Sequence, residues 1–99
     1  MDGLDIRLET GEHRLVLRLT GTLDGRTARA VTDAVRDLPA VPLTVDFSQV
    51  RTFVDLSVDA LTRALRDRPV SLTGLGRHQA RMFRYFGLRT VEAEQPIEA

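Results

Sequence analysis

Large apolar side chains follow two spacings along the chain, and the first of these predicts strands. Leu15, Leu17 and Leu19 alternate with other side chains, as in a strand with one buried face. The run Leu43–Phe47 is largely apolar, which is typical of a strand covered on both faces. The turn Thr10–Glu12 predicts that the first two strands form a hairpin. The segments predicted to be strands are Ile6–Glu9, His13–Leu19, Leu43–Phe47, Val70–Thr73 and Leu88–Glu92.

The second spacing, with apolar residues three and four positions apart, predicts helices. Three segments show it: Asp24 to about Leu38, Asp55–Asp67 and His78–Phe86. Asp24 and Asp55 open two of them and are predicted to cap their first turns. In the last helix Met82, Phe83 and Phe86 are predicted to point inward, and Gly87 to cap the C-terminus.

Strands and helices therefore alternate, which predicts an α/β fold. Right-handed crossovers between parallel strands give a mixed sheet of roughly four or five strands, with helices packed mainly on one face. We expect residues 1–92 to form a single domain, and the polar residues 93–99 to form a short C-terminal tail.

Leu56 breaks the pattern of the middle helix. On a wheel of roughly 100° per residue, its apolar residues gather on one side; these are Val54, Val58, Leu61 and Leu65. Leu56 falls on the opposite side, among charged residues such as Asp59 and Arg63, in the first turn. A single exposed Leu is common and by itself indicates no function. The position of Leu56 in the chain therefore decides whether its exposure points to a binding site.

Composition excludes several classes of protein. The 99 residues include no Cys, so no disulfide or thiolate metal site can form. No run approaches the roughly 20 apolar residues of a membrane span, and the first residues do not resemble a secretory signal. We therefore expect a cytoplasmic location without membrane insertion. The 14 basic residues balance 14 acidic ones, which argues against a general nucleic-acid binder.

No constellation in the sequence favours an enzyme, a metal site or a cofactor. His13 and His78 do not lie near a Ser or a pair of carboxylates at a catalytic or metal-ligand spacing. The Gly74–Gly76 segment precedes a helix, but it lacks the third Gly and the Lys of phosphate-binding loops, so a turn is favoured.

Two segments resemble the signature of the STAS family, the fold of bacterial anti-sigma factor antagonists. The first is Leu17 to Ala28, LRLTGTLDGRTA. The second is the strand–helix junction at Phe53, Val54 and Asp55. Members of this family then carry two Ser and a Gly, and the first Ser is phosphorylated. Here Leu56 occupies the phosphoacceptor position, Ser57 the second Ser position, and Val58 the Gly position.

The resemblance implies a non-catalytic module that binds a serine-kinase anti-sigma factor or a signalling complex, here without the usual phosphorylation switch. The alternative is a STAS subunit that regulates the ATPase of an ABC transporter of the lipid-transport type, and a third reading is a small-molecule-binding enzyme domain. Segments Gly21–Arg26 and Thr52–Ser57 should lie together at the carboxyl ends of the strands. The candidate partner-binding residues are Asp24, Gly25, Arg26, Thr27, Phe53, Asp55, Leu56, Ser57 and Asp59.

Two features, the Ser57 hydroxyl and the arginines of the last helix, each have two possible interpretations. The Ser57 hydroxyl lies toward the core side of the wheel, which favours a bond to a backbone group over phosphorylation. Arg77, Arg81 and Arg84 follow one face of the last helix. This face is either a solvated stripe or a docking face for acidic residues of a partner, because Arg pairs well with carboxylates. The sequence predicts no oligomeric state.

Overall fold

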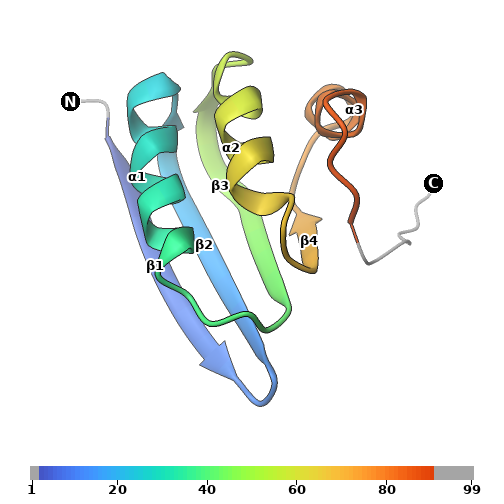
Figure 1. The fold of residues 1–99 in the computed structure, drawn as a ribbon. Coiled ribbons are helices and arrows are strands. Elements are labelled where there is room, and N and C mark those ends of the chain that lie inside the picture. Colours follow the sequence, from blue (N-terminus) through green and yellow to red (C-terminus); the bar gives the residue numbers. More distant parts are fainter. Residues whose placement is uncertain (1–2, 91–99) are drawn as a thin grey trace.

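The computed structural model describes residues 3–90, which form one four-stranded sheet and three helices (Figure 1). In chain order the elements are β1 Leu4–Gly11, β2 Arg14–Leu23, α1 Gly25–Arg36, β3 Leu43–Phe53, α2 Ser57–Leu65, β4 Val70–Thr73 and α3 Arg77–Tyr85. The strands lie in the order β1-β2-β3-β4. β1 is antiparallel to β2, whereas β2–β3 and β3–β4 are parallel pairs. The predicted mixed α/β sheet is confirmed.

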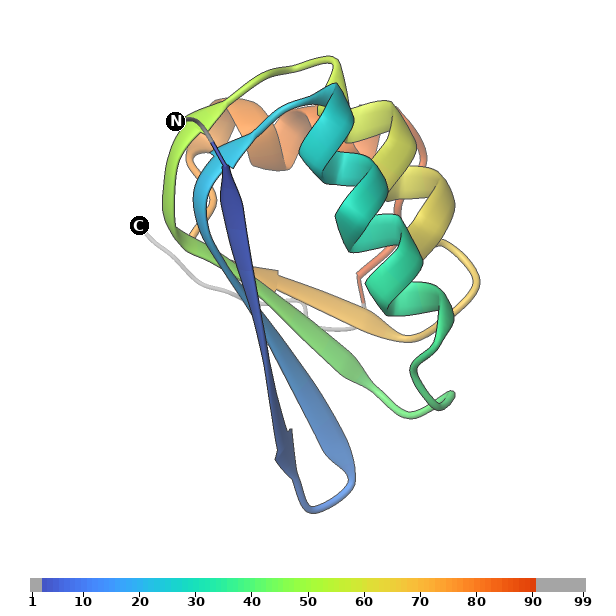
Figure 2. The same cartoon turned by 90° about the vertical axis from the view of Figure 1, so that its left-hand side faces the viewer.

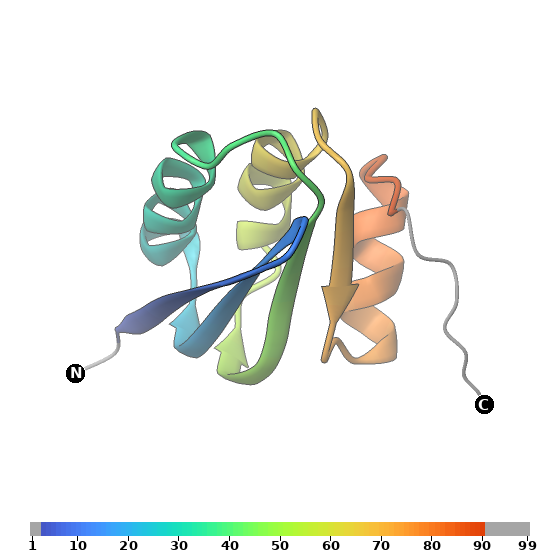
Figure 3. The same ribbon diagram turned by 90° about the horizontal axis from the view of Figure 1, so that it is seen from below.

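The helices lie on one side of the sheet, which Figures 2 and 3 show from two directions. α1 and α2 run side by side over the sheet, and α3 lies beyond them next to β4. Leu15, Leu17 and Leu19 of β2 are buried. They face the helices because the alternation of the strand puts every second side chain on that side. Three aromatic rings, those of Phe47, Phe53 and Phe83, meet at centroid distances of 5.6–6.3 Å.

The opposite face of the sheet is polar, and its side chains connect the strands. Arg18 of β2 pairs with Glu9 of β1 at 3.0 Å and with Asp46 of β3 at 2.7 Å. Thr73 of β4 donates to the same Asp46 carboxylate at 3.3 Å. Partial burial alone would raise the pKa of Asp46, but hydrogen bonds from Ser48, Arg18 and Thr73 hold this pKa below its ordinary value.

Three predictions about single elements are wrong. Leu88–Thr90 do not form a strand, and the rest of the predicted fifth strand lies outside the described residues, as does the predicted tail 93–99. Val54, expected on the core side, has 38% of its surface exposed and precedes the helix. Phe86, expected to point inward, is 40% exposed.

No helix in the described part of the chain is long and apolar enough to cross a bilayer.

The exposure of Phe86 follows from how α3 ends. Phe86 is the last residue before Gly87, which takes a φ of 96°. The N–H of Gly87 donates to Arg84 O and the N–H of Leu88 donates to Phe83 O, both at 3.0 Å. This is the Schellman arrangement, in which the residue after the Gly returns to the core. Leu88 therefore takes the buried place that was predicted for Phe86.

Two glycines with positive φ give a stability prediction. A Cβ at Gly74 (φ 78°) would overlap the backbone of Ser48, with its Cα only 2.7 Å away, whereas a Cβ at Gly87 would meet nothing. Gly87→Ala therefore adds only backbone strain, about 1–2 kcal/mol. We expect Gly74→Ala to cost about 3 kcal/mol or more, because overlap adds to the strain. Urea unfolding of the two variants compares them, and equal losses would contradict the packing described for Gly74.

Candidate functional site

The carboxyl ends of β2 and β3 bring together the two segments singled out in the sequence. Thr22 pairs with Thr52 and Leu23 with Phe53 in the parallel ladder. The N–H of Val54 donates to Leu23 O at 2.8 Å, so the strands stay paired up to the start of both helices. The expected adjacency of Gly21–Arg26 and Thr52–Ser57 is therefore confirmed. The two segments form one edge of the molecule.

Asp24 holds the first turn of α1 through a capping box. Its Oδ1 accepts the N–H groups of Arg26 at 3.0 Å and Thr27 at 2.9 Å. In return, the N–H of Asp24 donates to Thr27 Oγ1 at 2.9 Å, and this hydroxyl donates to Thr22 O. The predicted capping role of Asp24 is confirmed. Thr27 is buried, so it positions this edge and leaves Gly25 and Arg26 as its exposed residues.

The cap makes part of the stability dependent on pH. The hydrogen bond from the Thr27 N–H lowers the pKa of Asp24 below its ordinary 3.8, and hydrogen bonds from the Thr27 hydroxyl and the Arg26 N–H make smaller contributions. A carboxylate with a lowered folded pKa stabilises the fold fully above its unfolded pKa, and this contribution is lost as pH falls through the folded pKa.

Asp24→Asn tests this contribution, because Asn caps helices without a charge. We expect the variant to be less stable than the parent at neutral pH. We expect the difference to shrink once the pH falls below about 4, the ordinary pKa range of Asp. Thermal unfolding across this pH range measures the difference. A gap that stays constant with pH would show that the charge of Asp24 does not contribute.

Leu56 occupies the turn between β3 and α2 and points into solvent. Leu56 is 76% exposed. Among the large aliphatic residues of the described chain, this is the highest exposed fraction. It is the N-cap residue of α2, with φ −59° and ψ −25°, and no side chain caps this helix. The turn is closed by backbone bonds, Ser57 N–H to Val54 O at 2.9 Å and Val58 N–H to Asp55 O at 3.0 Å.

Ser57 is fully buried directly beside the exposed Leu56. Its hydroxyl donates to Val54 O at 2.7 Å, the same oxygen that accepts its N–H. The prediction that this hydroxyl bonds a backbone group is confirmed. A kinase needs an exposed hydroxyl, so a phosphate on Ser57 would require this turn to open.

Asp55 does not cap α2, so that prediction is wrong. Its Oδ2 lies 3.1 Å from Nε2 of His78, in the first turn of α3, and both side chains are more than half exposed. Because α2 starts after Leu56, Asp55 lies too early to reach the free N–H groups of the first turn. The contact connects the Leu56 turn to α3 across 23 residues of sequence, and no local sequence signal indicated it.

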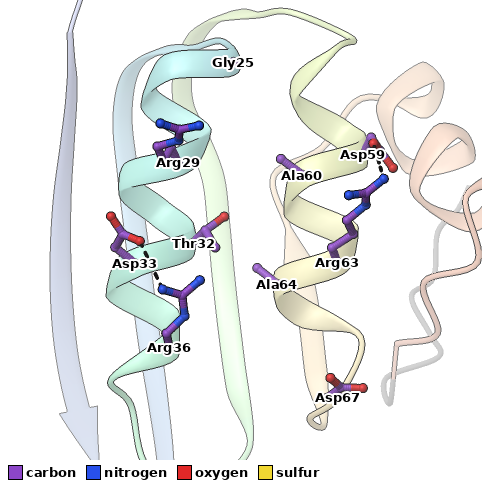
Figure 4. Close-up of a pocket in the computed structure, with 10 residues that line it drawn as sticks. All are labelled: Gly25, Arg29, Thr32, Asp33, Arg36, Asp59, Ala60, Arg63, Ala64 and Asp67. Carbon is purple, nitrogen blue, oxygen red and sulfur yellow. Dashed lines mark ion pairs between the residues drawn. The ribbon is translucent and has the colours of Figure 1, made fainter.

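A groove of about 680 Å³ runs between α1 and α2 (Figure 4). Ala60 and Ala64 of α2 point toward α1, and Thr32 of α1 points toward α2, so small side chains separate the helices. Charged residues of both signs line it: Arg29, Asp33 and Arg36 on α1, and Asp59, Arg63 and Asp67 on α2. Arg36 pairs with Asp33 at 3.6 Å, and Arg63 with Asp59 at 3.3 Å.

The groove begins at the edge that carries Leu56. Gly25 is the first residue of α1 and Asp59 lies in the first turn of α2, and both line it. The candidate residue Asp59 therefore belongs to the groove wall. Sequence reasoning missed the α1 wall, because its charged residues have the spacing of any solvated helix face.

The sequence matches the STAS_2 family, described as Mlab, STAS domain, over residues 6–93. The chain belongs to the STAS family. A comparison of the sequence with curated proteins gives no significant match.

Several solved structures have a similar fold. An anti-sigma factor antagonist from Mycobacterium paratuberculosis is 21% identical, with a TM-score of 0.69 over 88% of this chain and 80% of the other. The unphosphorylated anti-sigma factor antagonist SpoIIAA is 17% identical, with a TM-score of 0.64 over 91% of this chain and 90% of the other. Mglu is 22% identical with a TM-score of 0.66. This match covers 72% of the STAS chain but only 20% of Mglu, so it concerns a part of that protein.

Proposed function

We propose that this STAS chain is a non-catalytic protein-binding module of the anti-sigma factor antagonist type, whose partner packs on the edge around Leu56. The observation that carries the proposal is the 76% exposure of Leu56 at the start of α2, next to a fully buried Ser57. Apolar side chains surrounded by charged ones are typical of interfaces, which have an apolar centre and a polar rim.

The candidate residues divide into two groups by burial. Gly25, Arg26, Asp55, Leu56 and Asp59 are exposed and form the contact surface of the proposal. Asp24, Thr27, Phe53 and Ser57 are half-buried or buried and position the two turns. Both groups come from the predicted set, so the proposal keeps all nine residues but gives them different roles.

In this proposal the partner is a serine-kinase anti-sigma factor, bound in the cytoplasm as part of a signal that regulates transcription. In the resembling family, phosphorylation places close to two negative charges at the start of α2 and separates the complex. Leu56 offers no hydroxyl, and the Ser57 hydroxyl is buried and bonded to Val54 O. The chain therefore binds constitutively, or serves as a scaffold in a larger complex.

A second candidate is favoured by one observation, the name Mlab in the description of the matching family. In that candidate the same edge binds the ATPase of an ABC transporter of the lipid-transport type. Both candidates use an ATP-binding partner and the same surface. A pull-down with the full chain separates them, because mass spectrometry of the recovered partner identifies it as a serine kinase or as a transporter ATPase.

The absence of a switch gives a direct test with the kinase. Incubation of the chain with a serine-kinase partner and ATP is expected to leave its mass unchanged. Leu56→Ser is expected to gain one phosphate, because its hydroxyl is exposed at the start of a helix, where a phosphate is favoured. Intact-protein mass spectrometry measures both. Phosphate on Ser57 of the parent chain would contradict the proposal that the switch is lost.

A further inference from the structure

The segment Arg77–Thr90, which contains α3, is more positively charged than the chain as a whole. Between Arg77 and Thr90 the sequence carries four Arg and His78 but no Asp or Glu, whereas the whole chain has 14 basic and 14 acidic residues. This excess of positive charge is concentrated on an element at the outer side of the molecule, beside the edge strand β4 (Figures 1 and 3).

The arginines of α3 share one exposed face. Phe83 points into the core with 2% of its surface exposed. Arg77, Arg81 and Arg84 are exposed, and their spacing of four and three residues puts them together on the opposite side of the helix. Tyr85, four residues after Arg81, is 86% exposed. We call these four residues the α3 basic face.

The arginines of the α3 basic face make no ion pair within residues 3–90. Elsewhere in the chain Arg18, Arg36 and Arg63 each pair with a carboxylate at 2.7–3.6 Å. Like charges three or four residues apart on a helix repel each other and destabilise it. An acidic ligand would remove this repulsion.

A second groove, of about 890 Å³, borders this face between β4 and α3. Apolar side chains line it, namely Leu72, Leu75, Phe83 and Leu88. Arg84 of the α3 basic face and Arg89 line the same groove. A ligand that fits both features combines carboxylates with an apolar side chain.

We propose that the α3 basic face and this groove form a second docking surface, for an acidic segment of a protein partner that inserts an apolar side chain. Arg forks bind carboxylates with two parallel hydrogen bonds, and Tyr and Arg are among the residue types enriched at the energetically dominant positions of protein interfaces. Nucleic acid would use the phosphate contacts but leave the apolar groove empty. A flat membrane surface would not enter it.

The test is an NMR titration of the full ¹⁵N-labelled chain with a short Glu-rich peptide that contains one Leu. Saturable shifts are expected on α3 and along the β4–α3 groove. Arg81→Gln combined with Arg84→Gln is expected to weaken binding about tenfold, a loss of about 1.4 kcal/mol. The matched control is Arg29→Gln combined with Arg36→Gln on α1, which removes the same charge and is expected to bind like the parent.

Three results would overturn the proposal. The first is the absence of saturable shifts, or an equal loss of affinity in the control. The second is tighter binding of oligothymidylate or of phosphatidylglycerol vesicles than of the peptide. The third concerns the chain's own Glu92, Glu94 and Glu98: if their replacement by Gln strengthens peptide binding more than about tenfold, then residues 91–99 are the occupant. Leu56→Glu is expected to bind the peptide normally, so this test stands apart from the proposed function.

Discussion

Replacing Leu61 by Ala is expected to lower the free energy of unfolding by about 2–5 kcal/mol, the cost of deleting a large side chain from a packed core. Leu61 is fully buried on the inner side of α2, among the residues that pack against the sheet. The surrounding side chains cannot collapse fully into the space, so the loss includes both transfer and cavity contributions.

Leu56→Ala is the matched control, because it makes the same chemical change five residues earlier, at the N-cap of the same helix. Leu56 is 76% exposed, so we expect the change in unfolding free energy to stay within about 0.5 kcal/mol. Urea unfolding of the two variants gives both values, provided that the slope with urea is unchanged. Equal losses would show that the two faces of α2 are wrongly assigned.

The wheel of α2 could be read from the sequence because its faces differ strongly in polarity. The spacing of Val58, Leu61 and Leu65 identified the buried side, and it left Leu56 outside and Ser57 inside, as the structure shows. The cap at Asp24 was predictable for a similar reason, because its partner Thr27 lies only three residues away. The proximity of the segments Gly21–Arg26 and Thr52–Ser57 followed from the rule that the carboxyl ends of parallel strands lie at the same edge of a sheet.

Other features depend on contacts between residues distant in sequence. β3 continues to Phe53, beyond the predicted end at Phe47, because its polar residues keep pairing with β2. The Asp55–His78 contact arises from the packing of α3 beside the α2 turn, which neither local sequence specifies. The α1–α2 groove depends on small residues from two helices, and the residue spacing within either helix alone does not predict it.

The central functional prediction is that Leu56→Glu abolishes partner binding while it leaves the fold intact. The fold is expected to survive because the side chain lies in solvent, and because a negative charge near a helix N-terminus is favourable. Binding is expected to fail because the partner would bury an unpaired carboxylate at the centre of the interface. Such a charge costs about 3–5 kcal/mol, which corresponds to a loss of at least about a hundredfold in affinity.

Two further variants separate the apolar contact from the architecture around it. Leu56→Ser removes the apolar side chain without adding a charge, and it is expected to retain part of the binding. Asp24→Ala removes the cap of α1, and it is expected to weaken binding less than Leu56→Glu, because Asp24 acts mainly through the position of Gly25 and Arg26.

The most direct test is isothermal titration calorimetry of the parent chain and Leu56→Glu against the partner protein recovered by pull-down. Circular dichroism and urea unfolding first establish that the variant folds like the parent. The proposal predicts heat and saturation for the parent, and no measurable binding for Leu56→Glu. If Leu56→Glu binds this partner as tightly as the parent does, the edge around Leu56 is not the partner surface.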